Sequence, residues 1–73
     1  MPINDKLVAY HINRLKDRNP EVRLKTIHEL TLIGDQTALE ALEALYHTER
    51  DPVVRKAAQE AGRTLFLRLR SEK

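Results

Sequence analysis

The chain has 73 residues, of which 33% are charged and 41% hydrophobic, and it has no cysteine. The missing cysteines exclude disulfides, thiolate metal ligands and a thiol nucleophile, so a reducing, cytoplasmic setting fits best. The net charge of +2 is too small to indicate general nucleic-acid binding, and apolar runs such as Leu65 to Leu67 are too short for a membrane span, so we expect a soluble protein.

A first amphipathic helix is predicted from Asn4 or Asp5, either of which can cap it, to about Asp17. Its apolar residues recur at helical spacing: Leu7, Val8, Ile12 and Leu15. His11 falls inside this stripe. We interpret it as a core or boundary histidine with one hydrogen bond, because no partner for a metal-ligand role stands near it in the sequence.

A second helix is predicted from Pro20 to about Ile33, with Asn19 as its N-cap. Proline at the first helical position sacrifices no hydrogen bond, and Gly34 supplies a left-handed stop. The residues expected on the inward face are Val22, Thr26, Leu30 and Ile33.

A third helix is predicted to begin at Thr37, because Thr37 and Glu40 form a capping-box pattern. Alanines at positions 38, 41 and 44 permit the close approach of a neighbouring helix. The third helix carries acidic residues and no lysine or arginine, in contrast to the basic end of the chain.

A fourth helix is predicted from Pro52, after the cap Asp51, to about Leu69 or Arg70. Gly62 stands where the second helix has Leu30, and a glycine costs about 1 kcal/mol of helix propensity. We expect either tight packing that needs the missing side chain or a kink.

One seven-residue stretch occurs twice, 32 residues apart, as DRNPEVR from Asp17 to Arg23 and as ERDPVVR from Glu49 to Arg55. An internal period of this size is typical of stacked repeats. We therefore predict a single domain, 1–73, with repeat 1 at about 4–34 and repeat 2 at about 36–70.

This pattern resembles the HEAT repeat, and more closely the short bacterial variety known from phycobilisome lyases. The resemblance runs from Leu15 to Asp35 and again from Leu45 to Leu65, with two extra residues before Glu49. It implies an all-α fold, an α-α superhelix (α-solenoid) of two HEAT-like helical hairpins with four helices. The chain departs from the family at three positions, where the family prefers Ala, Asp and Leu: Thr26, Glu49 and Gly62.

The resemblance also implies a ladder of ion pairs between successive repeats, built from the acid six residues before each arginine. The candidate members are Asp17, Arg23, Glu49 and Arg55. Charged pairs at a repeat junction fix the stacking register, so we expect a structural role for these four residues.

Family geometry implies that the second helix of each hairpin lines the concave face. The 32-residue offset pairs Leu24 with Lys56, His28 with Glu60, and Thr31 with Arg63 along this face. The row is mixed in sign and lacks the series of cations that phosphate backbones need. Its candidates for weak recognition are His28, expected near Glu60, and Leu32.

The end of the fourth helix carries a surplus of apolar side chains. Phe66, Leu67 and Leu69 are interleaved with Arg68 and Arg70, and Arg63 precedes them by one turn. Three apolar residues on one last turn cannot all face a two-repeat core, and two repeats leave uncovered flanks. We expect docking onto another chain, either a second copy or a larger complex; the alternative is fraying with packing of Phe66 or Leu69 against the third helix.

No constellation of catalytic residues is present. The three histidines lack metal-ligand spacing, the one serine is Ser71, and no glycine-rich phosphate cradle exists. We expect no cofactor, no metal and no enzyme activity, and interpret the chain as a protein-protein interaction or assembly module. The resemblance leaves an accessory role in tetrapyrrole (bilin) attachment or phycobilisome turnover as an alternative; nucleic-acid binding through the basic C-terminal helix is a less favoured one.

Overall fold

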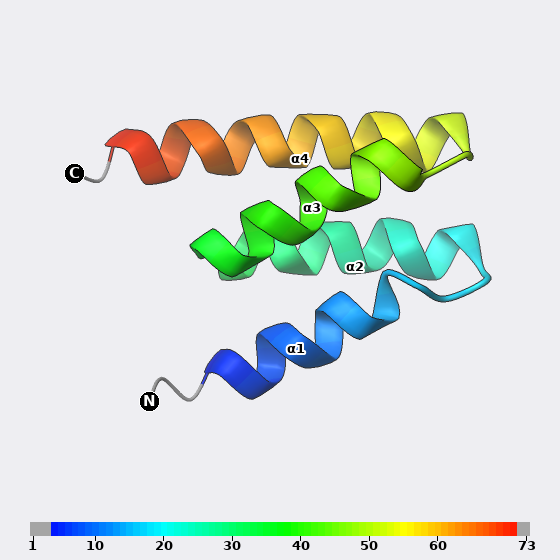
Figure 1. Ribbon diagram of the computed structural model, residues 1–73, viewed down its shortest axis with the longest axis horizontal. Coiled ribbons are helices and arrows are strands. Elements are labelled where there is room, and N and C mark those ends of the chain that lie inside the picture. The colour runs from blue at the N-terminus through cyan, green and yellow to red at the C-terminus, as the bar shows by residue number, and fades with distance from the viewer. Residues whose placement is uncertain (1–3, 72–73) are drawn as a thin grey trace.

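The computed structural model describes residues 4–71, with side chains from residue 6, and these residues form four helices and no strand. The helices are α1 (Asn4–Arg14), α2 (Pro20–Ile33), α3 (Gln36–Thr48) and α4 (Pro52–Ser71) (Figure 1). Each pair of consecutive helices forms an antiparallel hairpin, and the two hairpins stack. The predicted all-α fold of four helices is confirmed.

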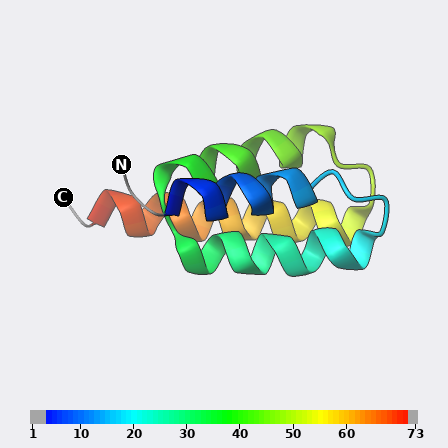
Figure 2. The ribbon, with the colours of Figure 1, turned by 90° about the horizontal axis from the view of Figure 1, so that it is seen from below.

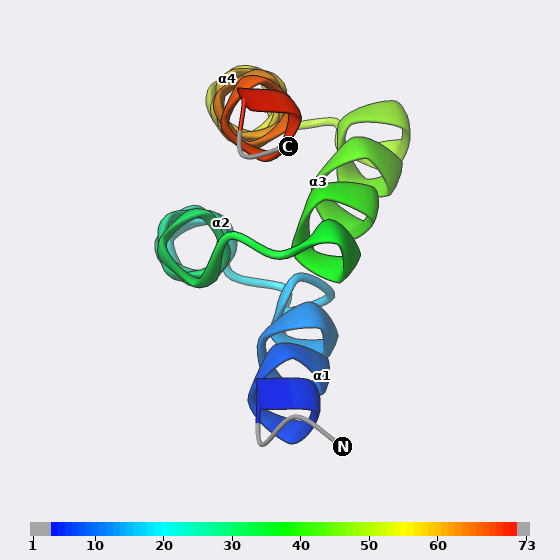
Figure 3. The same ribbon diagram turned by 90° about the vertical axis from the view of Figure 1, so that its left-hand side faces the viewer.

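The stacking creates two layers. α1 and α3 form one layer, while α2 and α4 run parallel in the other (Figures 2 and 3). α4 has 20 residues against 14 in α2, so its C-terminal end extends past the other helices (Figure 2). None of the four described helices has the length and apolar composition needed to cross a bilayer.

The hydrophobic core lies between the two layers. The largest fully buried side chains come from the last three helices: Thr26, Leu30, Leu42, Val54 and Leu65. Thr26 stands where the resembled family prefers Ala, and its hydroxyl donates to the carbonyl of Val22 at 2.6 Å. The polar atom is therefore satisfied inside the helix and does not disturb the core.

α1 ends earlier than predicted, at Arg14 instead of near Asp17. The chain tightens beyond it, because Lys16 N–H donates to the carbonyl of Asn13 and Asp17 N–H to that of Arg14, each at 3.1 Å. These bonds span three residues, as in a 3₁₀ turn. The predicted cap at Asn4 or Asp5 lies outside the described side chains.

The starts of α2 and α4 follow the cap-proline pattern. The Asn19 carboxamide oxygen accepts from the backbone N–H of Glu21 at 2.9 Å, and the Asp51 carboxylate accepts from the N–H groups of Val53 and Val54 at 2.9 and 3.2 Å. Gly34 ends α2 in the left-handed region, with φ 68°. The sequence therefore located these turns correctly.

The predicted cap of α3 was wrong. Asp35, not Thr37, accepts from the N–H of Ala38 at 2.8 Å, and its backbone is extended with φ −99° and ψ 175°. Because Gly34 stops α2 at once, the next residue is free to cap and Gln36 already begins α3. Thr37 lies inside the first turn, where a helical backbone excludes the N-cap role.

Gly62 causes neither of the two effects expected from the sequence. α4 continues through it as one straight helix (Figure 1). A Cβ atom built at Gly62 would meet only the Cγ of Glu43, at 4.0 Å. Helix packing therefore does not require a glycine here, and the missing side chain leaves open space beside α3.

Candidate functional site

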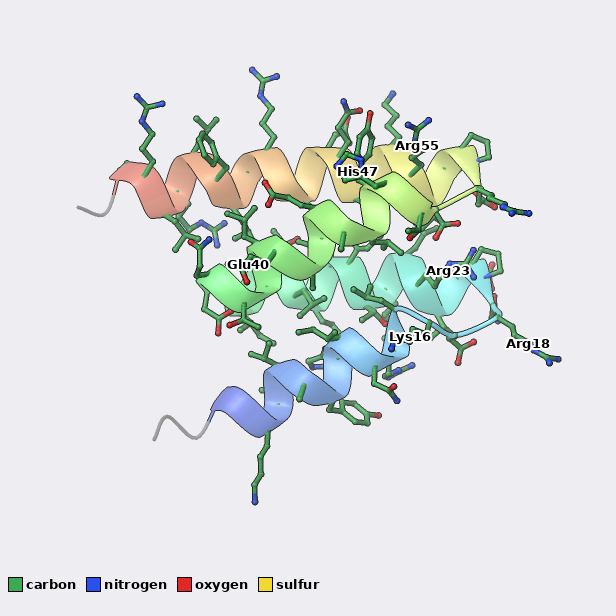
Figure 4. The ribbon with its side chains drawn as sticks, in the orientation of Figure 1. Lys16, Arg18, Arg23, Glu40, His47 and Arg55 are labelled. Atoms are coloured by element: carbon green, nitrogen blue, oxygen red, sulfur yellow. The ribbon has the colours of Figure 1, made fainter. Side chains whose placement is uncertain are left out.

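The junction between the two repeats is held by a bidentate ion pair. Arg23 Nε lies 2.8 Å from Glu49 Oε1, and Arg23 Nη2 lies 2.9 Å from Glu49 Oε2. Arg23 Nη1 also donates to the carbonyls of Asp17 and Arg18, at 2.7 and 3.1 Å. Figure 4 shows Arg23 on the first turn of α2, close to the loop that carries Arg18. One guanidinium therefore ties the end of α3 to the α1–α2 loop.

Glu49 is nearly enclosed, with its side chain 4% exposed. Its second oxygen also accepts from the backbone N–H of Asp51, at 3.0 Å. Burial disfavours the charged form, but the hydrogen bonds from Arg23 and Asp51 outweigh it, so the pKa of Glu49 lies below its ordinary value. The carboxylate is therefore charged at neutral pH, accepts hydrogen bonds at both oxygens, and has a structural role rather than that of a proton donor.

The other two predicted ladder members do not join this pair through their side chains. The Asp17 carboxylate accepts from the N–H of Asn19 at 2.9 Å. Arg55 Nε donates to the carbonyl of Tyr46 at 3.3 Å, and its guanidinium lies over the Tyr46 ring at 4.7 Å; Figure 4 shows Arg55 where α3 gives way to α4. Within the described chain, the predicted four-member ladder contains this one rung.

An open hollow of about 480 Å³ lies beside the ion pair, between α1 and α3. Ile12 and Leu15 line it from α1, and Ala41, Ala44 and Leu45 line it from α3. Ala41 and Ala44 line the hollow, so the close helix approach expected at the alanines is not made between α1 and α3 here. The chemistry of this hollow is apolar except at the Arg23 end.

His11 is the boundary residue between α1 and α2. Its side chain is 12% exposed, and Nδ1 lies 3.4 Å from Glu29 Oε1. Neither of these two atoms has a hydrogen-bond partner among the described residues, so the single bond predicted for His11 is not formed at Nδ1. The described chain contains no group of three His, Asp or Glu side chains able to hold a metal ion.

The exposed face of the α2–α4 layer carries scattered apolar side chains. Leu32 is 73% exposed and Leu67 51%. His28 and Glu60 occupy matching exposed positions, but no ion pair joins them among the side chains that are described. The row predicted for this face is not uniformly exposed, because Leu24 packs against the core and the Thr31 hydroxyl donates to the carbonyl of Ile27 at 2.8 Å.

The residues predicted for docking at the end of α4 divide into two groups. Phe66 is 50% exposed, and Arg63 and Arg70 are exposed with Leu67. Leu69 instead packs against the core. Arg68 Nη1 donates to the carbonyl of Thr31 at 3.1 Å.

Two of the predicted docking residues also make contacts within the chain. Arg68 binds the carbonyl end of α2, where a cation is favoured, and holds α4 to α2. Leu69 is turned inward because the last turn of α4 still reaches the start of α3, where it shares a hollow of about 230 Å³ with Gln36, Leu39 and Phe66.

A groove of about 460 Å³ between α3 and α4 was missed by the sequence reasoning. Glu43, Tyr46 and His47 line it from α3, and Gln59, Gly62, Arg63 and Phe66 line it from α4. We call this surface, together with the adjoining hollow at Gln36 and Leu69, the α3–α4 flank. Its one sequence signal was Gly62, whose missing side chain opens the groove.

Two stacked helical hairpins with a repeated cap-proline turn define an α-solenoid repeat protein. The family model for HEAT repeats matches residues 3–62, so the chain belongs to the HEAT repeat family, whose members generally bind other proteins. No curated protein and no solved structure gives a significant match. The family match ends at Gly62, and the exposed end of α4 follows it.

Proposed function

We propose that this chain is a non-catalytic protein-binding or assembly module that docks through the C-terminal end of α4 and the adjoining α3–α4 flank. The observation that carries the proposal is the end of α4. It extends beyond α2, lies outside the family match, and holds two adjacent half-exposed apolar residues, Phe66 and Leu67.

These apolar side chains differ from ordinary scattered surface leucines. Single exposed apolar residues need no explanation. Phe66 and Leu67, however, are neighbours on the last turns of α4, and Phe66 borders two hollows of the α3–α4 flank. An apolar centre beside concave surface is the usual core of a binding interface.

The charges around this centre supply a rim. Arg63 and Arg70 are exposed on either side of Phe66 along α4. Neither forms an ion pair with any carboxylate of the described side chains. Exposed cations around an apolar centre orient a partner with an acidic or polar rim and speed its association.

The test is quantitative capture of partners from cells of the source organism, using the tagged 73-residue chain. Leu67→Asp should abolish enrichment of a specific protein. The matched control is Leu7→Asp on α1, because Leu7 is similarly exposed at 47% but lies on the other repeat. A protein held by the wild type and the Leu7 variant but lost with Leu67→Asp supports the proposal; equal capture by all three refutes it.

Nucleic-acid binding is the second candidate, favoured by the alignment of Lys56, Arg63 and Arg70 on one line of α4. If each neutralised one phosphate, log affinity would fall against log salt with a slope of about −2.7. Duplex and single-stranded probes titrated at several salt concentrations would reveal it. The resemblance to phycobilisome-lyase repeats, and a bilin-related role with it, remains a prediction.

A further inference from the structure

The two repeats differ on the side that each would turn toward a following repeat. On α2 this side leads to Gly34, which lies against Leu65 and Arg68 of α4. One and two turns earlier on α2, Leu30 and Ile27 are buried at 0% and 3% exposed. The second hairpin therefore packs against apolar side chains of the first.

The matching positions of α4 are not apolar. At the 32-residue offset Leu24, Ile27, Leu30 and Thr31 correspond to Lys56, Gln59, Gly62 and Arg63. The side chains of Lys56, Gln59 and Arg63 are exposed. The α3–α4 flank is therefore a different kind of surface from the one that holds the repeats together, and a further hairpin stacked in the same way would bury unpaired charge.

The α3–α4 flank has two edges of opposite sign. Its α4 edge carries Lys56, Arg63 and Arg70, which are spaced by seven residues and so lie on one line of the helix. Its α3 edge carries Glu43, with Glu40 one turn earlier toward the outer side and no lysine or arginine on α3. The groove between these edges has Gly62 in its floor and Phe66 at one end.

We propose that the α3–α4 flank binds a second copy of the chain, face to face, about a two-fold axis that runs along the groove. This rests on the proposed function, in that it assigns the flank part of the docking surface to a particular occupant. The groove lies between α3 and α4, so such an axis lays α3 of each copy over α4 of the other. The acidic edge then meets the basic edge twice.

The level of the charges along the groove supports this pairing. A Cβ atom at Gly62, one residue before Arg63, would lie 4.0 Å from the Cγ of Glu43, so Glu43 and Arg63 lie at nearly the same height along the axis. The two-fold rotation preserves that height and places Glu43 of each copy against Arg63 of the other. An isologous contact of this kind is satisfied by one surface patch used twice.

Phe66 supplies the apolar part of the contact. It lies at the same end of the flank as the hollow bordered by Gln36, Leu39 and Leu69. The rotation carries each Phe66 across to the α3 side of the other copy, where that hollow opens. Two phenylalanines are buried together, each against apolar atoms beside the N-terminal end of α3.

The small size of the flank is consistent with a weak dimer. The molecule is 33 Å long and 16 Å across in the thin direction, so the shared face is smaller than the interfaces of about 800 Å² per partner that hold stable complexes. We therefore expect a dissociation constant in the micromolar range, with weaker association at high salt.

The experiment is sedimentation of the full chain from about 5 μM to about 1 mM, the range that brackets such an affinity. The wild-type mass should rise from 8.5 kDa toward twice that value. Glu43→Arg and Arg63→Glu should each remain monomeric, because like charges then meet twice. Thermal melts of both variants check that they are folded, as expected for exposed positions.

Charge exchange provides the decisive controls. An equimolar mixture of the Glu43→Arg and Arg63→Glu chains should restore the dimer, because opposite charges face each other at both contacts. The double variant in one chain should also dimerise. A monomeric wild type at the highest concentration, undiminished association of the single variants, or a mixture that stays monomeric would each overturn the proposal.

The Leu67→Asp variant separates this proposal from the proposed function. Leu67 follows Phe66 by one residue and therefore points about 100° away, off the flank. It should leave dimerisation unchanged within error while it abolishes capture of a different protein. If Leu67→Asp abolishes capture but not dimerisation, the result supports the proposed function. If charge reversal at Glu43 or Arg63 abolishes the dimer but not capture, the result supports the pairing of copies.

Discussion

Replacing Gly62 by alanine should stabilise the protein. Gly62 lies in the middle of α4, where the helix is continuous and straight. The new Cβ would come no closer than 4.0 Å to its nearest neighbour outside the helix backbone, the Cγ of Glu43. That is an ordinary van der Waals distance, so the substitution introduces no overlap and adds a small contact with α3.

The magnitude follows from helix propensity. A glycine in a helix interior is about 0.8–1.0 kcal/mol less favourable than alanine, and part of this difference arises because glycine loses more backbone entropy on folding. We expect a gain of about 1 kcal/mol in the free energy of unfolding. For a domain of this size, that gain raises Tm by about 4–8 °C.

Gly34→Ala is the opposite case and serves as the matched control. Gly34 has φ 68°, a left-handed conformation that costs alanine about 1–2 kcal/mol. A Cβ there would also lie 3.0 Å from Arg68 Nη1, so the guanidinium that binds the end of α2 would have to shift. We expect a loss of about 1–2 kcal/mol at Gly34.

The assay is thermal and urea unfolding followed by circular dichroism. The protein should be dilute, so that self-association does not contribute to stability. The wild type and both alanine variants should unfold with the same m-value, because the surface exposed on unfolding is unchanged. A Gly62→Ala variant less stable than the wild type would refute the packing argument, and a stabilised Gly34→Ala variant would refute the cap argument.

Three further predictions concern the contacts that hold the fold. Glu49→Gln removes the carboxylate that Arg23 binds and should cost about 3 kcal/mol by leaving a mostly buried charge unpaired. Because the pKa of Glu49 is lowered on folding, the stability it contributes is complete above the ordinary glutamate pKa of about 4.3 and is lost as pH falls through the folded value. The free energy of unfolding, measured by urea titration from pH 7 to acid, should therefore fall less steeply in the variant than in the wild type. Asp35→Ala should lower the free energy of unfolding by about 1 kcal/mol and Thr37→Ala should leave it nearly unchanged in the same titrations, since Asp35 caps α3. Equal losses would instead support Thr37 as the cap, as predicted from the sequence. Arg68→Ala should speed amide hydrogen exchange in the last turn of α4 relative to the wild type, because its bond to α2 is removed, and unchanged exchange would show that Leu69 alone holds this turn.

The sequence located the elements whose ends carry short-range signals. Asn19 and Asp51 precede prolines, and Gly34 has the freedom a helix stop requires, so these turns are determined by neighbouring residues alone. Asp35 was missed because two capping residues stand close together. The choice between them depends on how sharply the chain leaves Gly34, which local composition does not reveal.

The surfaces were harder to predict than the elements. The repeat offset was visible in the sequence, but it does not say which side of each helix meets the other hairpin. Once the structure orients the helices, the sequence becomes informative: Ala57 and Ala61 of α4 match Lys25 and Glu29 of α2, so small residues stand where hairpins meet and charged ones where they do not. The sequence predicted uncovered flanks but not their character, and the α3–α4 flank is polar with an apolar end at Phe66.

The adjacent positions of Phe66 and Leu67 give the end of α4 two directions of contact. A helix turns about 100° per residue, so Phe66 borders the α3–α4 flank while Leu67 lies on the exposed face of the α2–α4 layer with Leu32. In the proposed pair of copies, each Phe66 is covered and each Leu67 stays open. The pair then presents two identical apolar sites held at a fixed separation, and a partner with two matching segments would bind it more tightly than the monomer without any new contact. Dimerisation on one side of the helix would thus strengthen recognition on the other.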